Sequence, residues 1–229
     1  MSAASEGGLQ EIEILRAYVR VDDPEAVKSD LEYSGILERR MLRIREVLSG
    51  WMRSLALPPR AIFSVELAFK EATSNCVYHG NLGRSSELRE TADHNADIQD
   101  MRARRTKNLY ARAIEVRVLV QHVCAEQPPM VPSSVELTVT QNEEVTLIDR
   151  FCVEMIERIE AIGVPQSIAI VLRDEGEGFD WKNAPDPTDP ENVEKASGRG
   201  VLLMKSFMNE VRYNEKGNEV TMVKSALFA

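Results

Sequence analysis

Aromatic residues and cysteines are scarce in this chain of 229 residues. Aromatic residues make up 6% of it, so a buried core must consist mainly of aliphatic side chains and methionine. The three cysteines, Cys76, Cys124 and Cys152, have neither the spacing of zinc ligands nor that of a redox pair. An odd, scattered set of cysteines is typical of a reducing compartment, which indicates a cytoplasmic location.

Long apolar runs and an excess of positive charge are also missing. No apolar run approaches the roughly 20 residues that span a bilayer, and residues 1–10 lack the basic and apolar regions of a signal peptide. The formal net charge is −9, whereas a nucleic-acid-binding surface needs clustered basic residues. The one basic cluster, residues 102–107, is short and lies among acidic residues. We therefore expect neither a membrane nor a nucleic-acid partner.

What remains is the pattern of a globular α/β (α+β) protein. Hydrophobic residues make up 43% of the chain and charged residues 28%, which is ordinary for a folded domain. Alternation and helical spacing of apolar residues predict these elements: strands at 10–21, 112–123, 134–140 and 167–173, helices at 36–56, 60–79, 145–162 and 200–208, and a terminal hairpin of 210–214 with 219–227. This order predicts a two-layer sandwich, with helices on one face of a mixed β-sheet.

The first candidate site is a polar stripe on the helix predicted at 60–79. Glu71, Asn75 and His79 are four residues apart, so their side chains share one stripe. Asn75 can offer a neutral oxygen to Mg²⁺, and Glu71 can accept a proton from an attacking hydroxyl. We interpret His79 as a cap or core-edge side chain. The alternative is that Glu71 and Asn75 lie on a solvated helix face.

The second candidate is the acidic, glycine-rich segment 174–180, directly after an apolar strand. Asp174, at the strand end, can accept a hydrogen bond from an adenine amino group, and Gly176 and Gly178 allow the backbone to turn sharply and to approach a flat base. An acidic surface turn is the plainer interpretation. A calcium loop is a further one, although the spacing of the oxygen ligands is not that of an EF-hand.

The third candidate is Gly198-Arg199-Gly200, at the start of the helix predicted at 200–208. Amides at a helix N-terminus can hold phosphate, and Arg199 can add a charge-assisted contact. The proline-containing stretch before it has the character of a lid. Alternatively, the two glycines only start a helix. The amphipathic helix predicted at 145–162 either packs on the body of the domain or contacts a partner.

These three motifs, in this order, resemble the N, G1 and G2 boxes of the GHKL (Bergerat-fold) ATPase superfamily. Three segments are similar in particular to anti-sigma-factor serine/threonine protein kinases: ELAFKEATSNCVYHGN (66–81), LRDEGEGFD (172–180) and SGRGVLLMKSFMNEVRYNEKGNEV (197–220). Histidine kinases carry the same boxes, but no phosphoacceptor-histidine helix pair is apparent ahead of 66–81.

The resemblance implies a Bergerat ATP-binding domain over residues 1–229, with ATP and Mg²⁺ as ligands. It implies that Glu71 is the general base for a serine hydroxyl of a protein substrate, that Asn75 binds Mg²⁺, and that Asp174 binds the adenine amino group. Kinases of this family commonly dimerise, sequester a sigma factor and phosphorylate an anti-sigma-factor antagonist in partner-switching regulation of transcription. An ATP-binding interaction module without catalysis is the alternative, and a plain α/β domain with coincidental motifs is a third possibility.

The resemblance also implies roles for the glycines of the site. The base pocket would include Gly176 and Gly178, and the ATP lid would include Gly198, Arg199 and Gly200. The sequence departs from the family pattern in two ways. A Gly-Thr pair near the final strands helps to hold the base in the family, and here the corresponding pair is Gly217-Asn218. Extra segments at about 82–111 and 121–165 have no role that the resemblance supplies.

Overall fold

The computed structural model describes residues 9–84, 108–123, 135–139, 165–183, 199–225 and 227. Along the chain the elements are β1 (Leu9–Val19), α1 (Asp30–Ser54), α2 (Pro59–Ser74), a π-helical turn (Asn75–Asn81), a 3₁₀ turn (Leu109–Ala111), β2 (Ile114–Val123), β3 (Val135–Val139), β4 (Ser167–Asp174), α5 (Arg199–Phe207), β5 (Glu210–Tyr213) and β6 (Glu219–Ser225). Gly198 and the helix predicted at 145–162 lie outside the described residues.

The strands form one six-stranded sheet in the order β3-β1-β2-β4-β6-β5. β3 runs parallel to β1, and the other neighbouring strands are antiparallel, so the predicted mixed sheet is confirmed. β3 belongs to the extra segment 121–165, part of which therefore extends the sheet at its edge. In β1 the register shifts between Glu13 and Leu15, which allows both Ile14 and Leu15 to be buried.

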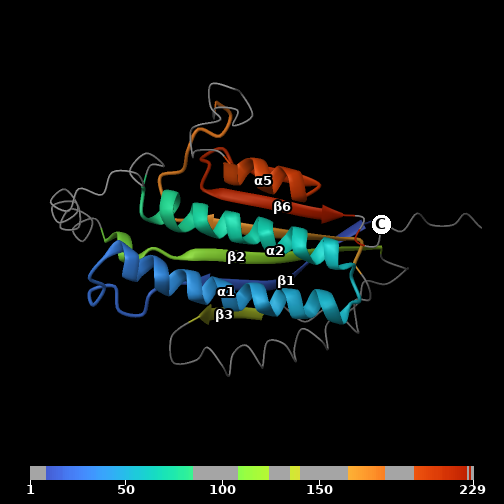
Figure 1. Cartoon of the computed structure of the whole chain (residues 1–229), viewed down its shortest axis with the longest axis horizontal. Helices are drawn as coiled ribbons and strands as arrows, with labels where there is room; N and C mark the ends of the chain where they lie inside the picture. The colour runs from blue at the N-terminus through green and yellow to red at the C-terminus, as the bar shows by residue number, and fades with distance from the viewer. Residues whose placement is uncertain are drawn as a thin grey trace, which may run out of the picture.

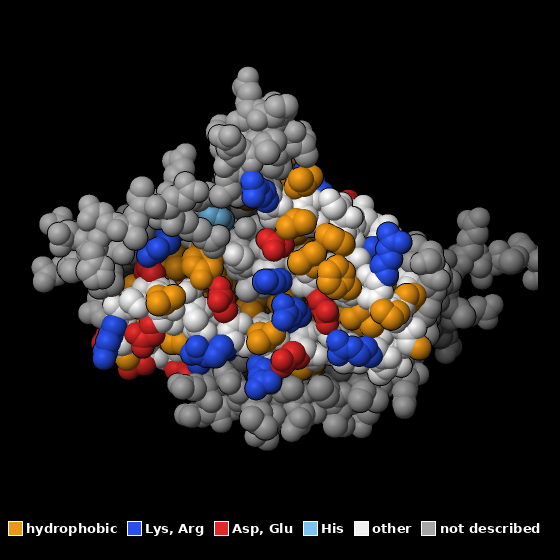
Figure 2. Space-filling view, in the orientation of Figure 1, with side chains coloured by type: hydrophobic (Ala, Val, Ile, Leu, Met, Phe, Trp, Pro, Cys, Tyr) orange, Lys and Arg blue, Asp and Glu red, His pale blue; other side chains and the backbone are white. Residues whose placement is uncertain are grey.

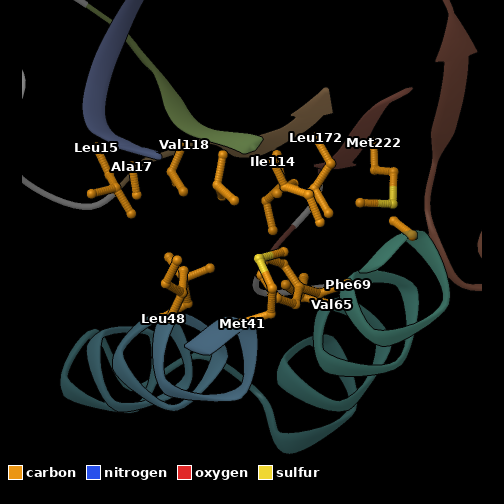
Figure 3. Packing of buried hydrophobic residues seen from close by; sticks show 14 of the residues in the cluster. Leu15, Ala17, Met41, Leu48, Val65, Phe69, Ile114, Val118, Leu172 and Met222 are labelled. Carbon is orange, nitrogen blue, oxygen red and sulfur yellow. The ribbon is translucent and has the colours of Figure 1, made fainter. Parts of the chain in front are cut away.

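The described α-helices, α1, α2 and α5, lie on the same face of this sheet (Figure 1). Figure 3 shows side chains of α1 and α2 facing labelled side chains of β1, β2, β4 and β6. The stripe predicted on α2 is buried, as is the alternating face of β2. On β2 this face consists of Ile114, Val116, Val118 and Val120. The predicted two-layer sandwich is thus confirmed.

Helix α1 begins at Asp30, six residues before the start predicted from its apolar spacing. Its N-cap explains the difference. The Ser29 Oγ accepts a hydrogen bond from the Glu32 N–H at 3.1 Å, and the Glu32 carboxylate accepts one from the Lys28 N–H at 2.8 Å. This reciprocal arrangement resembles a capping box, which satisfies backbone donors at the helix start.

Helix α2 changes its winding where the candidate site begins. The prediction of one helix over 60–79 is wrong in this respect, because the α-helix ends at Ser74 and a π-helical turn covers Asn75–Asn81. Gly80, predicted to stop the helix, lies inside this turn. Such π-helical turns occur frequently at functional sites. The predicted helix at 200–208 and both strands of the terminal hairpin are confirmed within one or two residues.

Candidate functional site

The first and third sequence motifs meet where α5 starts. A Cβ placed on Gly200 would lie 3.1 Å from the Glu71 Oε2 and 3.6 Å from the Asn75 Oδ1. Both polar side chains are half-buried at the edge of the core, not on a fully solvated face. Arg199 is exposed at the first position of α5. The glycine therefore allows the amide end of α5 to approach a carboxylate and a carboxamide closely.

A second cluster surrounds Asp174, at the end of β4. The Asp174 carboxylate is buried and accepts a hydrogen bond from the Gly176 N–H at 2.8 Å. A Cβ on Gly80 would lie 2.3 Å from the Asp174 Cγ, and a Cβ on Gly176 would lie 2.3 Å from the Gly80 carbonyl oxygen. Only glycine fits at both positions. Asn75 and Gly80 belong to the same π-helical turn, so the two clusters are adjacent.

Burial changes the ionisation of this cluster. It raises the pKa of Asp174 to about 6, while the hydrogen bond from Gly176, the Cys76 thiol and the cations Lys216 and Arg112 oppose the change. Burial and the neighbouring Asp174 also raise the pKa of Cys76. Cys76 is thus a neutral thiol, and its hydrogen bond to Asp174 stabilises the ionised carboxylate.

Gly178 lies against the turn between β5 and β6. Its φ is +79°, and a Cβ would lie 1.9 Å from the Lys216 carbonyl oxygen. Gly217, with φ of +77°, lies against Phe179, whose carbonyl oxygen would be 2.1 Å from a Cβ. From the sequence, Gly176 and Gly178 are predicted to let the backbone turn sharply and approach a flat base. In the structure, the nearest neighbours of Gly176 and Gly178 are backbone atoms of Gly80 and Lys216.

Sequence reasoning missed Asn81, which joins the π-helical turn to α1 and to the residues that flank β2 and β4. This side chain is fully buried. Its Oδ1 accepts from the Glu175 N–H at 3.1 Å, and its Nδ2 donates to the Tyr33 hydroxyl at 3.1 Å and to the Ala113 carbonyl at 3.3 Å. The Arg112 guanidinium donates to the Asn81 carbonyl at 2.9 Å. The position of Asn81 at the polar end of the 66–81 motif was the sequence signal that could have identified it.

His79, interpreted from the sequence as a cap or core-edge side chain, lies in the last turn of the π-helical segment. Its side chain is exposed, and its Nδ1 lies 2.6 Å from the Arg84 carbonyl oxygen. This contact ties the π-helical turn to the chain that follows it.

The donor set fits a nucleotide that carries Mg²⁺. Among the residues that the structure describes, no three His, Cys, Asp or Glu side chains gather as a metal-binding group. Mg²⁺ commonly takes one or two protein ligands and completes its shell with phosphate oxygens and water. The Asn75 Oδ1, with the Glu71 carboxylate beside it, matches that requirement.

Comparison with protein families agrees with this geometry. The model of a family described as the histidine kinase-like ATPase domain matches residues 37–224, which include both clusters. In a comparison with curated proteins, none matches the chain. The matched region covers most of the sequence and holds the three motifs in the order expected, so the chain belongs to the family of histidine kinase-like ATPase domains, of the GHKL type.

Proposed function

We propose that this chain binds ATP with Mg²⁺ and transfers the γ-phosphate to a serine or threonine of a protein substrate. The observation that carries the proposal is the convergence of Glu71 and Asn75 on the start of α5 at Gly200. Phosphoryl transfer depends mainly on positioning and on neutralising charge. Those needs would be met by a general base, a metal ligand and the phosphate-binding N-terminus of a helix, all at one point.

Each group has a role that its surroundings support. The Asn75 Oδ1 would hold Mg²⁺, and the Glu71 carboxylate would take the proton of the attacking hydroxyl. The first amides of α5 would hold phosphate oxygens, because the helix dipole favours negative charge there. The Asp174 carboxylate would accept a hydrogen bond from the adenine amino group.

The substrate and partners follow the resemblance to anti-sigma-factor kinases. We propose a cytoplasmic homodimer that phosphorylates an anti-sigma-factor antagonist and sequesters a sigma factor. Apolar side chains over α2 and α5 support a protein partner (Figure 2). Phe63 is 55% exposed and Leu203 37% exposed, and Phe63 meets the Phe207 ring edge-on at 5.9 Å. Exposed apolar patches of this kind often bind proteins.

A regulatory ATP-binding module without catalysis is the second candidate. Helix α5 joins the phosphate-binding end at Gly200 to the exposed side chains of Leu202 and Leu203. Nucleotide bound at one end of this helix would therefore bias the surface that a partner contacts.

Substituting Glu71 separates the two candidates. With radiolabelled ATP and a candidate antagonist protein, we expect Glu71→Gln to reduce phosphate transfer by about 10²-fold or more, with little change in ATP affinity. Glu66→Gln is the matched control, because Glu66 lies on the same helix and pairs with Arg53 at 3.2 Å. Equal transfer by Glu71→Gln and the wild type would refute the kinase proposal. ATP-dependent binding of the antagonist without transfer would favour the second candidate.

A further inference from the structure

The turn between β5 and β6, residues 214–218, contacts residues 174–181 at several points. These contacts add to those of Gly178 and Gly217 described above. The Lys216 Nζ donates to the Gly176 carbonyl at 2.7 Å, and the Trp181 Nε1 donates to the Asn214 carbonyl at 2.8 Å. The Tyr213 ring, directly before the turn, packs against Phe179 and Trp181, with centroids 5.2 and 6.1 Å away. The turn is thus held by hydrogen bonds and ring contacts to several of residues 174–181.

Asn214 organises this turn from within. Its Oδ1 accepts hydrogen bonds from the N–H groups of Gly217 at 2.7 Å, Asn218 at 3.1 Å and Glu219 at 3.3 Å. Its Nδ2 donates to the Asn218 Oδ1 at 2.9 Å. A single amide side chain therefore holds three backbone donors and also sets the orientation of a second amide.

Asn218 in turn holds Asp174. The Asp174 N–H donates to the Asn218 carbonyl at 3.0 Å, and the Asn218 Nδ2 donates to the Asp174 carbonyl at 2.8 Å. The Asn218 residue is only 5% exposed, so these bonds form in a site largely shielded from water. Both backbone polar groups of Asp174 are fixed by one residue, and this restricts where its carboxylate points.

We propose that Asn218, oriented by Asn214, is a positioning residue for Asp174 and thereby sets the preference for an amino group at position 6 of the purine. This inference rests on the proposed ATP site. Asparagine suits the task because its amide has a donor and an acceptor on separate atoms, which bond Asp174 and Asn214 at the same time. It also accounts for Gly217-Asn218 in place of the family's Gly-Thr pair.

Comparing ATP with inosine triphosphate tests the inference. The two nucleotides differ at position 6, where inosine carries an oxo group that cannot donate a hydrogen bond to the Asp174 carboxylate. We expect Asn218→Ala to weaken ATP binding about tenfold, because a loss of that size corresponds to one hydrogen bond between Asp174 and the adenine amino group. Binding of inosine triphosphate should change by less than about twofold, because that ligand does not use the Asp174 contact.

Two further variants keep the test decisive. Asn214→Asp retains the oxygen that holds the turn and removes the amide donated to Asn218, so it should reproduce the selective loss of ATP affinity even if Asn218→Ala does not fold. Asn209→Ala is the matched control: this exposed asparagine, at the other end of the hairpin, accepts from the Ser225 N–H at 3.1 Å, and we expect neither affinity to change. Displacement of a fluorescent ATP analogue measures both affinities.

The outcomes are distinct. Equal losses for both nucleotides in Asn218→Ala and Asn214→Asp would show a purely structural role and overturn the inference, as would unchanged ATP affinity. In the Asp174→Asn background, Asn218→Ala should have no further effect on ATP. If the wild-type protein binds neither nucleotide, the proposed function itself fails.

Discussion

Asp174 is a buried carboxyl group, and its surroundings decide its charge. Burial raises its pKa from 3.8 to about 6. Because the folded protein binds this proton more tightly than the unfolded chain does, the group favours folding most at low pH. Its contribution to the free energy of unfolding decreases as pH rises from about 4 to about 6. At neutral pH, Asp174 is therefore a destabilised, ionised carboxylate that can only accept hydrogen bonds.

Adenosine affinity should consequently depend on pH. The ionised carboxylate is the form that only accepts hydrogen bonds, so we expect affinity to be level above about pH 6 and to fall up to about tenfold per unit below it. Adenosine is the ligand of choice because it lacks the ionising phosphates of ATP. Calorimetry across this range makes the measurement, and Asp174→Asn should show weak binding without this pH dependence. A profile that does not change in the wild type would contradict the assignment of Asp174.

At the scale of elements, the π-helical turn after α2 brings the candidate site together. It begins with Asn75, which faces α5, and it contains Gly80, which lies against Asp174. Its last residue, Asn81, is hydrogen-bonded to Glu175 at the end of β4. Hence one turn sets the spacing between the groups proposed to bind the metal ion and the adenine base.

Gly80→Ala should disrupt this element. The new Cβ would lie 2.3 Å from the Asp174 Cγ and 2.5 Å from both carboxylate oxygens. Overpacking of this kind costs about 1–3 kcal/mol, and displacement of Asp174 should also abolish ATP binding. Urea denaturation and nucleotide titration measure the two effects. Gly50→Ala in α1 is the control, because it meets nothing within 4 Å and should be neutral or stabilising by up to about 1 kcal/mol. Wild-type stability and affinity in Gly80→Ala would disprove the close contact.

At the scale of the whole molecule, the protein and its proposed ligand carry charge of the same sign. The net charge of −9 would repel ATP at long range, so the proposed site relies on Mg²⁺, α5 and Arg199 to neutralise the phosphates locally. No described helix combines the length and the apolar character needed to cross a bilayer. The homodimer and the absence of a nucleic-acid partner remain predictions, which light scattering and a gel-shift assay with duplex DNA would test.

ATP with Mg²⁺ should raise the melting temperature of the whole chain. A ligand at 100 times its dissociation constant stabilises the folded state by about 2.7 kcal/mol. We expect this shift to need Mg²⁺ for its full size and to be largely lost in Asp174→Asn. Calorimetry or a dye-based melt follows it. If neither ATP nor ADP moves the melting temperature, the nucleotide-binding assignment is wrong.

Local patterns predicted most of the elements. The alternation of Ile114, Val116, Val118 and Val120 and the stripe on α2 depend only on neighbouring residues, so the sequence predicts them well. The start of α1 was missed because the prediction followed apolar spacing alone, although Ser29 and Glu32 carried a capping signal. The π-helical turn was missed because nothing local distinguishes it from a continued α-helix.

By itself, the sequence determined the fold class, the order of the three motifs and the residue types available for binding a nucleotide, because these depend on spacing along the chain. Only the tertiary structure decided which of these residues meet. Gly200 against Glu71, Gly80 against Asp174, and Asn218 holding the Asp174 backbone are contacts between distant segments. They arise from the strand order β3-β1-β2-β4-β6-β5 and from the packing of α5 on α2. Close packing selects such pairs by volume and hydrogen bonding in three dimensions, which spacing along the chain does not encode.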